Sequence, residues 1–246
     1  MALQDYIDKR TANVYGIYGH LGGGKSLTAV ELSLYYLSIG WSVTSNIQIR
    51  VSSAVADRYH FIQDFEGVDF WSLPCGAPRG SSSPFRSVIV IDECAEFFDQ
   101  YSSSSPVLKR FLSWLRHSSK RGQFVFLIVQ KPEFISKSLR LLINKWIVCD
   151  DMEQWRLPVF KVRLPFTRNY VARRLFDRYG NLLSRGFNFA DKRIFGRYYN
   201  TAQSIAVEGR ENDFVQEDLP EIEPLGFTIF LNLFLIVYIL YIILWQ

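Results

Sequence analysis

The chain has 246 residues, enough for one sizeable domain with additions. Its 48% hydrophobic and 21% charged residues exclude a chain that is disordered throughout. Its three widely spaced cysteines exclude a disulfide framework and a zinc site. The net charge of +4 is unevenly spread, because residues 208–246 hold one arginine and seven carboxylates, a net −6, which leaves +10 on residues 1–207.

A phosphate-binding loop is predicted near the start of the chain. The residues from Gly19 to Ser26 read G-x-x-x-x-G-K-S, and they follow a short apolar run, Val14–Tyr18, and precede a helical pattern that ends near Gly40. A strand, a glycine loop and a helix are the required context, since the loop amides and the helix N-terminus together attract phosphate. The residues predicted to bind ATP are Gly19, His20, Leu21, Gly22, Gly23, Gly24, Lys25, Ser26 and Leu27.

Two carboxylates follow a second apolar strand, Val88–Ile91. Four β-branched residues in a row predict a strand buried on both faces of a parallel sheet, and ligands bind beyond the carboxyl ends of such strands. Asp92 and Ser26 are therefore predicted to hold Mg²⁺, and Glu93 is predicted to activate the attacking water. Lys25 is predicted to reach the β- and γ-phosphates, which makes Lys25 and Glu93 candidate catalytic residues.

Gln130 is the third candidate catalytic residue, at the end of the predicted strand Phe124–Val129. It either senses the γ-phosphate or is ordinary strand-end polarity. With a fifth predicted strand, Trp146–Cys149, these elements predict a P-loop NTPase fold over residues 1–154: a three-layer α/β sandwich with a mostly parallel sheet. Helices are predicted for Ser52–Phe65, Val107–Ser118 and Phe134–Leu142, and a strand for Phe70–Leu73.

Residues 155–207 predict a small antiparallel β extension at the sheet edge, with Trp155–Phe166 pairing with Asn169–Phe176. Arginines and lysines alternate there with aromatic residues. That mixture suits single-stranded nucleic acid, through phosphate pairing and base stacking, or a small aromatic core with solvated arginines. The basic residues concerned are Arg168, Arg173, Arg174, Arg178, Arg185, Lys192, Arg193 and Arg197.

The last part of the chain predicts a linker and a membrane anchor. Residues 208–226 are acidic and contain Pro220 and Pro224. The stretch from Phe227 to Trp245 has 19 residues without a charge, long enough to cross the hydrocarbon core as a helix. A buried terminal helix is the alternative. As an anchor it is expected to insert tail-first into the host inner membrane, a single pass that leaves the ATPase domain in the cytoplasm.

The order of these elements resembles the zonula occludens toxin-like (Zot) family of filamentous-phage assembly ATPases, which are related to FtsK–HerA-type P-loop motors. The resemblance covers about residues 13–150, and its most specific part is Phe111–Gln123 followed by a strand and Gln130. It implies an ATP hydrolase that requires Mg²⁺ and uses ATP to translocate, package or extrude DNA, with single-stranded DNA favoured, during virion assembly. It also implies a homo-oligomer, of which a hexameric ring is one form, with phage assembly proteins or a capsid as partners.

Three matters stay open at this point. Extrusion of a filamentous particle and packaging into a capsid are not separated by the sequence. An arginine from a neighbouring subunit is expected to complete the ATP site, with Arg140, Arg116 and Arg121 as candidates. The alternative function is an ATP-binding membrane scaffold or switch that recruits assembly or secretion partners without moving DNA. A small-molecule kinase is disfavoured by the apolar tail and by Glu93 directly after Asp92.

Overall fold

The computed structural model describes Leu3, Ile7 and residues 13–65, 67–77, 86–98, 105–154, 167–184 and 187–199. The chain divides into two compact units, Met1–Phe214 and Val215–Gln246, and all described residues belong to the first. The linker and anchor predicted for residues 208–245, and the strand predicted for Trp155–Phe166, therefore lie outside the described residues. Within the described part, no helix is both long enough and apolar enough to cross a membrane.

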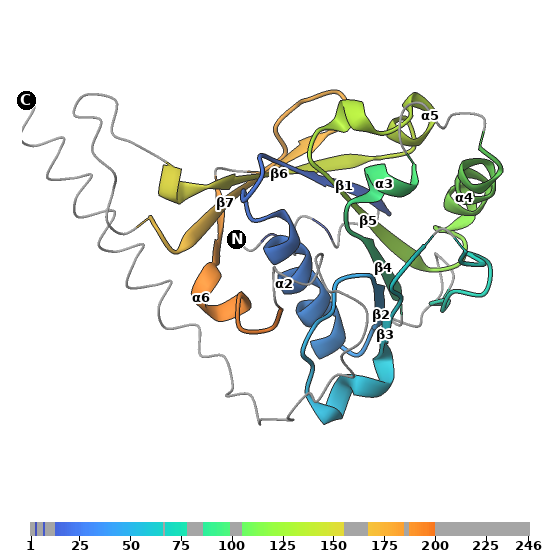
Figure 1. Ribbon diagram of the computed structural model, residues 1–246, viewed down its shortest axis with the longest axis horizontal. Helices are drawn as coiled ribbons and strands as arrows, with labels where there is room; N and C mark the ends of the chain where they lie inside the picture. Colours follow the sequence, from blue (N-terminus) through green and yellow to red (C-terminus); the bar gives the residue numbers. More distant parts are fainter. Residues whose placement is uncertain are drawn as a thin grey trace, which may run out of the picture. The chain divides into compact units, whose positions relative to one another are not determined.

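One eight-stranded sheet organises the first unit, in the order β3-β2-β4-β5-β1-β6-β7-β8 (Figure 1). The strands are β1 (Val14–Tyr18), β2 (Ser42–Ser45), β3 (Tyr59–Phe61), β4 (Ser87–Ile91), β5 (Gln123–Val129), β6 (Lys145–Asp151), β7 (Tyr170–Asp177) and β8 (Asn188–Asp191). Strands β3 to β6 in this order are parallel, whereas β7 pairs antiparallel with both β6 and β8. The prediction of a mixed, mostly parallel α/β sheet is confirmed.

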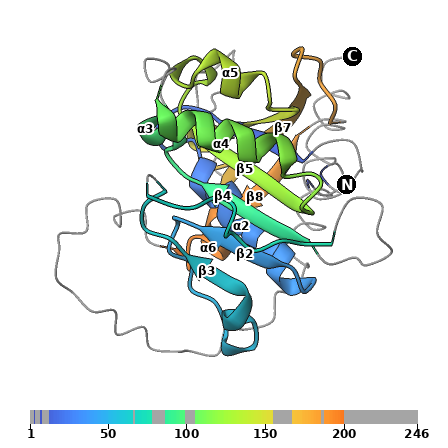
Figure 2. The ribbon, with the colours of Figure 1, turned by 90° about the vertical axis from the view of Figure 1, so that its right-hand side faces the viewer.

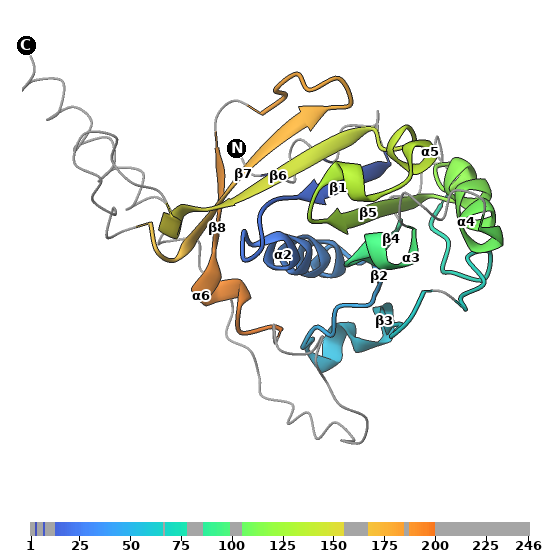
Figure 3. The same ribbon diagram turned by 45° about the horizontal axis from the view of Figure 1, so that its top comes forward.

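Helices cover both faces of this sheet. Helix α2 (Lys25–Ser38) lies on one face, and α3 (Cys94–Phe97), α4 (Pro106–His117) and α5 (Lys137–Arg140) cover the other (Figures 2 and 3). The remaining elements are the short helix α6 (Lys192–Phe195) and the 3₁₀ turns Ser53–Arg58, Pro132–Phe134 and Met152–Gln154. The result is a three-layer arrangement around a sheet whose central strands are buried on both faces.

The two cores follow from alternation along the strands. On the α2 face, Tyr15 of β1 stacks on Phe126 of β5 with ring centroids 5.2 Å apart, and Tyr36 of α2 packs over Phe126. On the opposite face, Val14, Leu127 and their neighbours meet aromatic side chains from α4 and the loop before β4. Phe70, Phe98, Phe111 and Trp114 form the centre of this second core.

Three predicted elements differ in the structure. Residues 52–65 hold a 3₁₀ turn and the edge strand β3 rather than one helix, and Phe70–Leu73 forms turns rather than a strand. Phe70 is nonetheless buried, because it fills the aromatic core beneath α4. The helix expected over Phe134–Leu142 is reduced to α5, which begins after Ser136, whose hydroxyl accepts a hydrogen bond from the backbone N–H of Leu139.

The predicted antiparallel extension is part of the main sheet. Strand β7 pairs with β6 over its whole length, from Lys145–Asp177 to Asp151–Val171, and β8 adds to its free edge. The extension predicted at the sheet edge thus continues the main sheet as its antiparallel edge strands. Strand β7 is therefore the direct neighbour of β6, which carries Cys149, and lies two strands away from β1.

Candidate nucleotide-binding and hydrolysis site

The phosphate-binding loop joins β1 to α2 and is pressed against β6 and β7. Gly24 has φ 83° and begins α2, and a Cβ built there would lie 2.2 Å from the side chain of Val171. A Cβ at Gly19 would lie 2.2 Å from the carbonyl oxygen of Cys149. Glycine is required at both positions because no larger residue fits between the loop and its neighbouring strands.

Lys25 is the first residue of α2, and its side chain reaches back into this loop. Its side chain is 6% exposed, and Nζ donates hydrogen bonds to the carbonyl oxygens of Gly19 (3.2 Å) and His20 (3.0 Å). The ammonium group is thus held inside the loop, where a phosphate would replace these carbonyls as its partner. His20 and Leu21 are exposed at the loop tip, with Leu21 80% exposed, and Leu27 is buried in the first turn of α2.

Ser26 and Asp92 meet as predicted. The Ser26 hydroxyl donates to Asp92 Oδ2 at 2.7 Å, which joins the first turn of α2 to the end of β4. Burial raises the pKa of Asp92, although the hydrogen bonds from Ser26 and from the Glu93 N–H and the nearby Lys25 lower it. A hydroxyl and a desolvated carboxylate are hard oxygen ligands of the kind that Mg²⁺ prefers, so these two residues fit the predicted metal.

Glu93 and Gln130 also meet, although they come from different strands. Their side chains are hydrogen-bonded, and burial followed by the charge of Asp92 raises the pKa of Glu93. Glu93 has φ 49°, the single positive φ of a non-glycine residue in the described ranges. Strain of this kind gathers at functional sites, and here it turns the Glu93 carboxylate to the end of β5.

The strand order explains why Gln130 belongs to the site. Strand β5 lies between β1 and β4, and all three run parallel. Their carboxyl ends therefore place the phosphate loop, Gln130 and the Asp92–Glu93 pair side by side at one edge of the sheet. The sequence predicted these residues separately, and the sheet brings them together.

Sequence reasoning missed two residues near Asp92. The side chain of Asn46, at the end of β2, accepts from the Asp92 N–H (2.7 Å) and donates to the Asp92 carbonyl (3.0 Å), so it fixes the backbone at the metal-binding position. Tyr199 forms an isolated bridge with Ile49, and its pKa is raised to about 12 by burial and by the Asp92 charge. The available signal for Asn46 was a polar residue directly after the alternating run Trp41–Ser45.

The basic residues of the predicted extension are distributed over several environments. Arg173 is buried and pairs with Glu31 of α2, so it fits neither alternative that the sequence left open: a guanidinium that is 2% exposed is not solvated and does not reach a phosphodiester. Arg174 lies over the rings of Phe176 and Phe187, at 5.6 and 5.1 Å. Three others form ion pairs, Arg168 with Glu153, Lys192 with Asp151 and Glu153, and Arg193 with Asp191. Arg178 and Arg197 are exposed, and Arg185 lies outside the described residues.

The three arginines considered as partners of a neighbouring ATP site also differ. Arg121 donates to the carbonyl oxygens of Trp71 (2.7 Å) and Leu73 (3.3 Å) and lies over the Trp71 ring, so it holds its own subunit's loop in place. Arg116 is exposed on the last turn of α4, and Arg140 is half-buried on α5. Arg121 therefore has a structural role in its own subunit, whereas Arg116 and Arg140 stay candidates for completing a neighbouring ATP site.

Together, a glycine loop between a central strand and a helix, and an acidic pair on a strand two places away, define the chain as a P-loop NTPase. The family model described as zonular occludens toxin (Zot) matches residues 13–173. The chain belongs to this family, as its sequence resemblance predicted.

Comparisons with individual proteins show how much of this chain, and how much of each relative, the similarity covers. The gene 1 protein of Enterobacteria phage I2-2 is 24% identical over 161 residues, which cover 59% of this chain and 42% of that protein. The gene 1 protein of Enterobacteria phage M13 is 23% identical over 154 residues, covering 59% and 44%. The chain thus matches less than half the length of these relatives.

Solved structures with a similar fold include the N-terminal domain of zonular occludens toxin from Neisseria meningitidis (14% identity, TM-score 0.45, covering 77% of this chain and 99% of that one). Another is the genome packaging NTPase B204 from Sulfolobus turreted icosahedral virus 2 in complex with ATP-gammaS (14% identity, TM-score 0.43, covering 73% and 97%). Because both scores are low, the family assignment rests on the family model.

Proposed function

We propose that the protein is an ATP hydrolase that works in the assembly of a phage particle. The observation that carries the proposal is the contact between Ser26 Oγ and Asp92 Oδ2, with the hydrogen-bonded Glu93 and Gln130 directly beside it. A nucleotide-binding loop without a base would suit a switch, whereas a base beside the predicted metal ligands suits hydrolysis. The phage origin of the gene 1 relatives supports the biological setting.

Each residue has a distinct task in this proposal. The loop amides and Lys25 bind the phosphates, and Ser26 and Asp92 hold Mg²⁺, which neutralises phosphate charge when bound. Glu93 accepts a proton from the attacking water, a task that its raised pKa favours because a base works best when its pKa is near the ambient pH. Gln130 holds the Glu93 carboxylate by a hydrogen bond and, from the end of β5, would sense the γ-phosphate.

We extend the proposal to the finer points that the sequence predicted. The hydrolysis drives movement of DNA, in extrusion or packaging, by a homo-oligomer anchored in the host inner membrane through Phe227–Trp245. The +10 charge on residues 1–207 supports a polyanionic partner. The alternative to this extension is a membrane scaffold that binds ATP without moving DNA.

The test compares two variants of the full-length chain. Lys25→Ala is expected to lose ATP binding and hydrolysis together, whereas Glu93→Gln is expected to keep ATP binding and lose at least a hundredfold in hydrolysis rate, since general-base catalysis contributes about 10²–10⁴-fold. Phosphate release and binding of a fluorescent ATP analogue are measured on the same samples. Hydrolysis by Glu93→Gln at the wild-type rate would remove Glu93 from the mechanism, and absence of hydrolysis in the wild type would favour the scaffold.

A further inference from the structure

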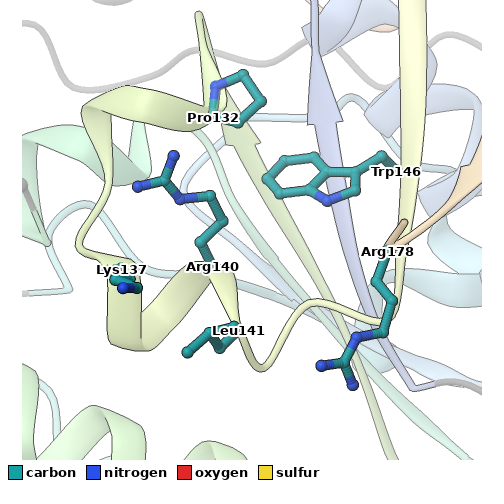
Figure 4. Close-up of a pocket in the computed structure, with 6 residues that line it drawn as sticks. All are labelled: Pro132, Lys137, Arg140, Leu141, Trp146 and Arg178. Carbon is teal, nitrogen blue, oxygen red and sulfur yellow. The ribbon is translucent and has the colours of Figure 1, made fainter. Parts of the chain in front are cut away.

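A pocket outside the ATP site is lined by three basic side chains and by apolar groups. It has a volume of about 380 Å³ and is formed by Pro132, Lys137, Arg140, Leu141, Trp146 and Arg178. Figure 4 shows Lys137, Arg140 and Leu141 on one side of the pocket and Trp146 and Arg178 on the other. The basic groups come from two elements far apart in sequence, α5 and the end of β7, so the fold brings them together.

These cations are available to a ligand. In the described part of the chain, no ion pair or hydrogen bond joins Lys137, Arg140 or Arg178 to a carboxylate, and no acidic residue lines the pocket. The adjacent Asp177 is occupied in the turn after β7, where it accepts from the N–H groups of Tyr179 and Asn181, both at 2.8 Å. Three basic side chains line this hollow without a carboxylate among them, so an anion in the pocket would balance their charge.

The apolar half of the lining narrows the chemistry of the ligand. Trp146 is 8% exposed and forms the buried wall of the pocket, whereas Leu141 is 58% exposed at the rim. Tyr179 is 78% exposed and lies under the guanidinium of Arg178, at 5.1 Å. Phosphate-binding cations next to exposed aromatic and aliphatic surface are the combination that binds single-stranded nucleic acid, since the phosphodiester pairs with the cations and the base stacks.

The hollow favours nucleic acid over a membrane surface. Its volume lies in the range of about 300–1,000 Å³ that is typical of pockets for small organic groups, and a single nucleotide is such a group. An anionic bilayer presents a broad face of headgroups, which needs an exposed basic surface rather than a pocket. The outer face of α4, with Lys109 and Arg110 exposed, offers such a surface and serves below as the control.

The pocket is connected to the ATP site by two short paths. Pro132 follows Gln130 by two residues, and Gln130 is hydrogen-bonded to Glu93. Trp146 packs edge-on against Tyr18, with ring centroids 5.6 Å apart, and Tyr18 directly precedes Gly19 of the phosphate loop. A ligand that shifts Pro132 therefore acts on Glu93, the proposed general base. A ligand that shifts Trp146 acts on the phosphate-binding loop.

We propose that this pocket binds one nucleotide of single-stranded DNA, with its phosphate on the basic side chains of Lys137, Arg140 and Arg178 and its base against the apolar lining of Leu141 and Trp146, and that its occupation stimulates ATP hydrolysis. The inference rests on the proposed ATPase function. It adds the site at which DNA contacts the protein and states that DNA binding there raises the rate of ATP hydrolysis. It places the DNA contact at Arg178, in the turn after β7, on the side of the strand that carries Arg174 and Phe176 and opposite the side on which Arg173 is buried.

The test uses the full-length chain and a fluorescent oligothymidylate. The double variant Lys137→Gln/Arg178→Gln is expected to bind it at least tenfold more weakly, the size expected for the loss of two charge-assisted contacts. The slope of log affinity against log salt should become shallower by about 0.7, since the pocket neutralises one phosphate. Basal ATP hydrolysis is expected to be unchanged, and its stimulation by the oligonucleotide is expected to be lost.

The matched control is Lys109→Gln/Arg110→Gln, which removes the same charge from α4. It is expected to change oligonucleotide affinity by less than threefold and to keep the stimulation. If both double variants weaken oligonucleotide binding equally, the binding comes from general electrostatic attraction, and the proposed DNA-binding pocket is wrong. Binding to phosphatidylglycerol vesicles with no affinity for the oligonucleotide would overturn it in favour of a membrane surface. Absence of basal hydrolysis in the wild type would instead contradict the proposed function, and the oligonucleotide binding of the two variants would still decide on the pocket.

Discussion

Asp92 is a buried carboxylate, and its burial has a consequence for the stability of the protein. Its pKa is raised above the ordinary 3.8, mainly by burial. Between pH 3.8 and the raised pKa, the unfolded chain releases the proton while the folded chain keeps it, so stability falls as the pH rises through this window and stays lower above it. A neutral side chain of the same shape should avoid that loss.

We expect Asp92→Asn to raise the melting temperature of the nucleotide-free protein at pH 7, with a gain that disappears as the pH falls toward 3.8. The substitution should also abolish the stabilisation by ATP and Mg²⁺, since a ligand stabilises only the state that binds it. Melting curves from pH 4 to 8, with and without ATP and Mg²⁺, measure both effects. A gain that is the same at every pH would contradict the role of ionisation.

Asp177→Asn supplies a control of opposite sign. Its pKa is lowered by the hydrogen bond from the Asn181 side chain and by backbone N–H donors of the same turn. A lowered pKa gives stability that is present above pH 3.8 and lost as the pH falls through the folded value. We therefore expect this variant to melt lower than the wild type at pH 7 and to approach it in acid.

Single residues also show why part of the site was predictable. The spacing from Gly19 to Ser26 and the carboxylates after Val88–Ile91 carry their function in local sequence, because each needs only its own strand and loop. Asn46 carries its function through a neighbour, the backbone of Asp92, and that contact exists only because β2 pairs with β4. Strand order is a property of the whole sheet, so the sequence did not reveal it.

Strand β7 shows the same limit for a complete element. Its alternating pattern predicted a strand, but not that odd-numbered residues face α2 and the phosphate loop. Val171 packs against Gly24, and Arg173 forms a bidentate pair with Glu31, its second contact being 3.2 Å from Nη2 to Oε1. Arg173 Nη2 also donates to the Phe189 carbonyl at 3.1 Å, so one buried guanidinium joins β7, β8 and α2.

This buried pair makes a prediction about how α2 is held. Removing one partner leaves the other charge buried and uncompensated, so Arg173→Met alone should cost about 3–5 kcal/mol. The double variant Glu31→Leu/Arg173→Met removes both charges and should recover most of that loss. Urea unfolding of the single and double variants, analysed as a double-mutant cycle, gives the coupling free energy.

The exposed pair Arg193–Asp191 is the matched comparison, since Arg193 is 60% exposed. Arg193→Met should cost about 0–1 kcal/mol, because surface ion pairs are screened by solvent. Asp191 keeps its second role there, accepting from the Arg193 N–H at the start of α6, whatever the side chain at 193. Equal costs for Arg173→Met and Arg193→Met would show that burial adds nothing to the first pair.

The predicted helices and strands failed where tertiary packing decided the outcome. Residues 52–65 have the composition of a helix, yet their last part becomes β3 because β2 offers it a free parallel edge. Phe70–Leu73 has the composition of a strand, yet Phe70 is drawn into the aromatic core of Phe111 and Trp114, and no strand position is left beside it. Where an apolar run has no competing environment, as in β4 and β5, the prediction was right.

For the molecule as a whole, charge and hydropathy divide the chain more sharply than its fold does. The described sheet carries the ATP site at one edge and the basic pocket beside β7, and both belong to the first unit. The remaining unit, Val215–Gln246, contains the uncharged stretch Phe227–Trp245. A stretch of this length and polarity has a favourable transfer free energy into a bilayer as a helix.

We therefore expect the full-length protein to sediment with bacterial membranes and to resist extraction by high salt and by alkaline carbonate. Replacing Leu235 and Ile236 with arginine, near the centre of the stretch, should move most of the protein out of the membrane fraction, since an arginine there costs about 2.5–3.5 kcal/mol on insertion. A matched replacement of Leu112 is unsuitable because that residue is in the core, so Ser113→Arg on the exposed face of α4 serves as the control. Release of the wild-type protein by high salt alone would show that charge holds the protein at the membrane. The prediction of a transmembrane helix at Phe227–Trp245 would then be wrong.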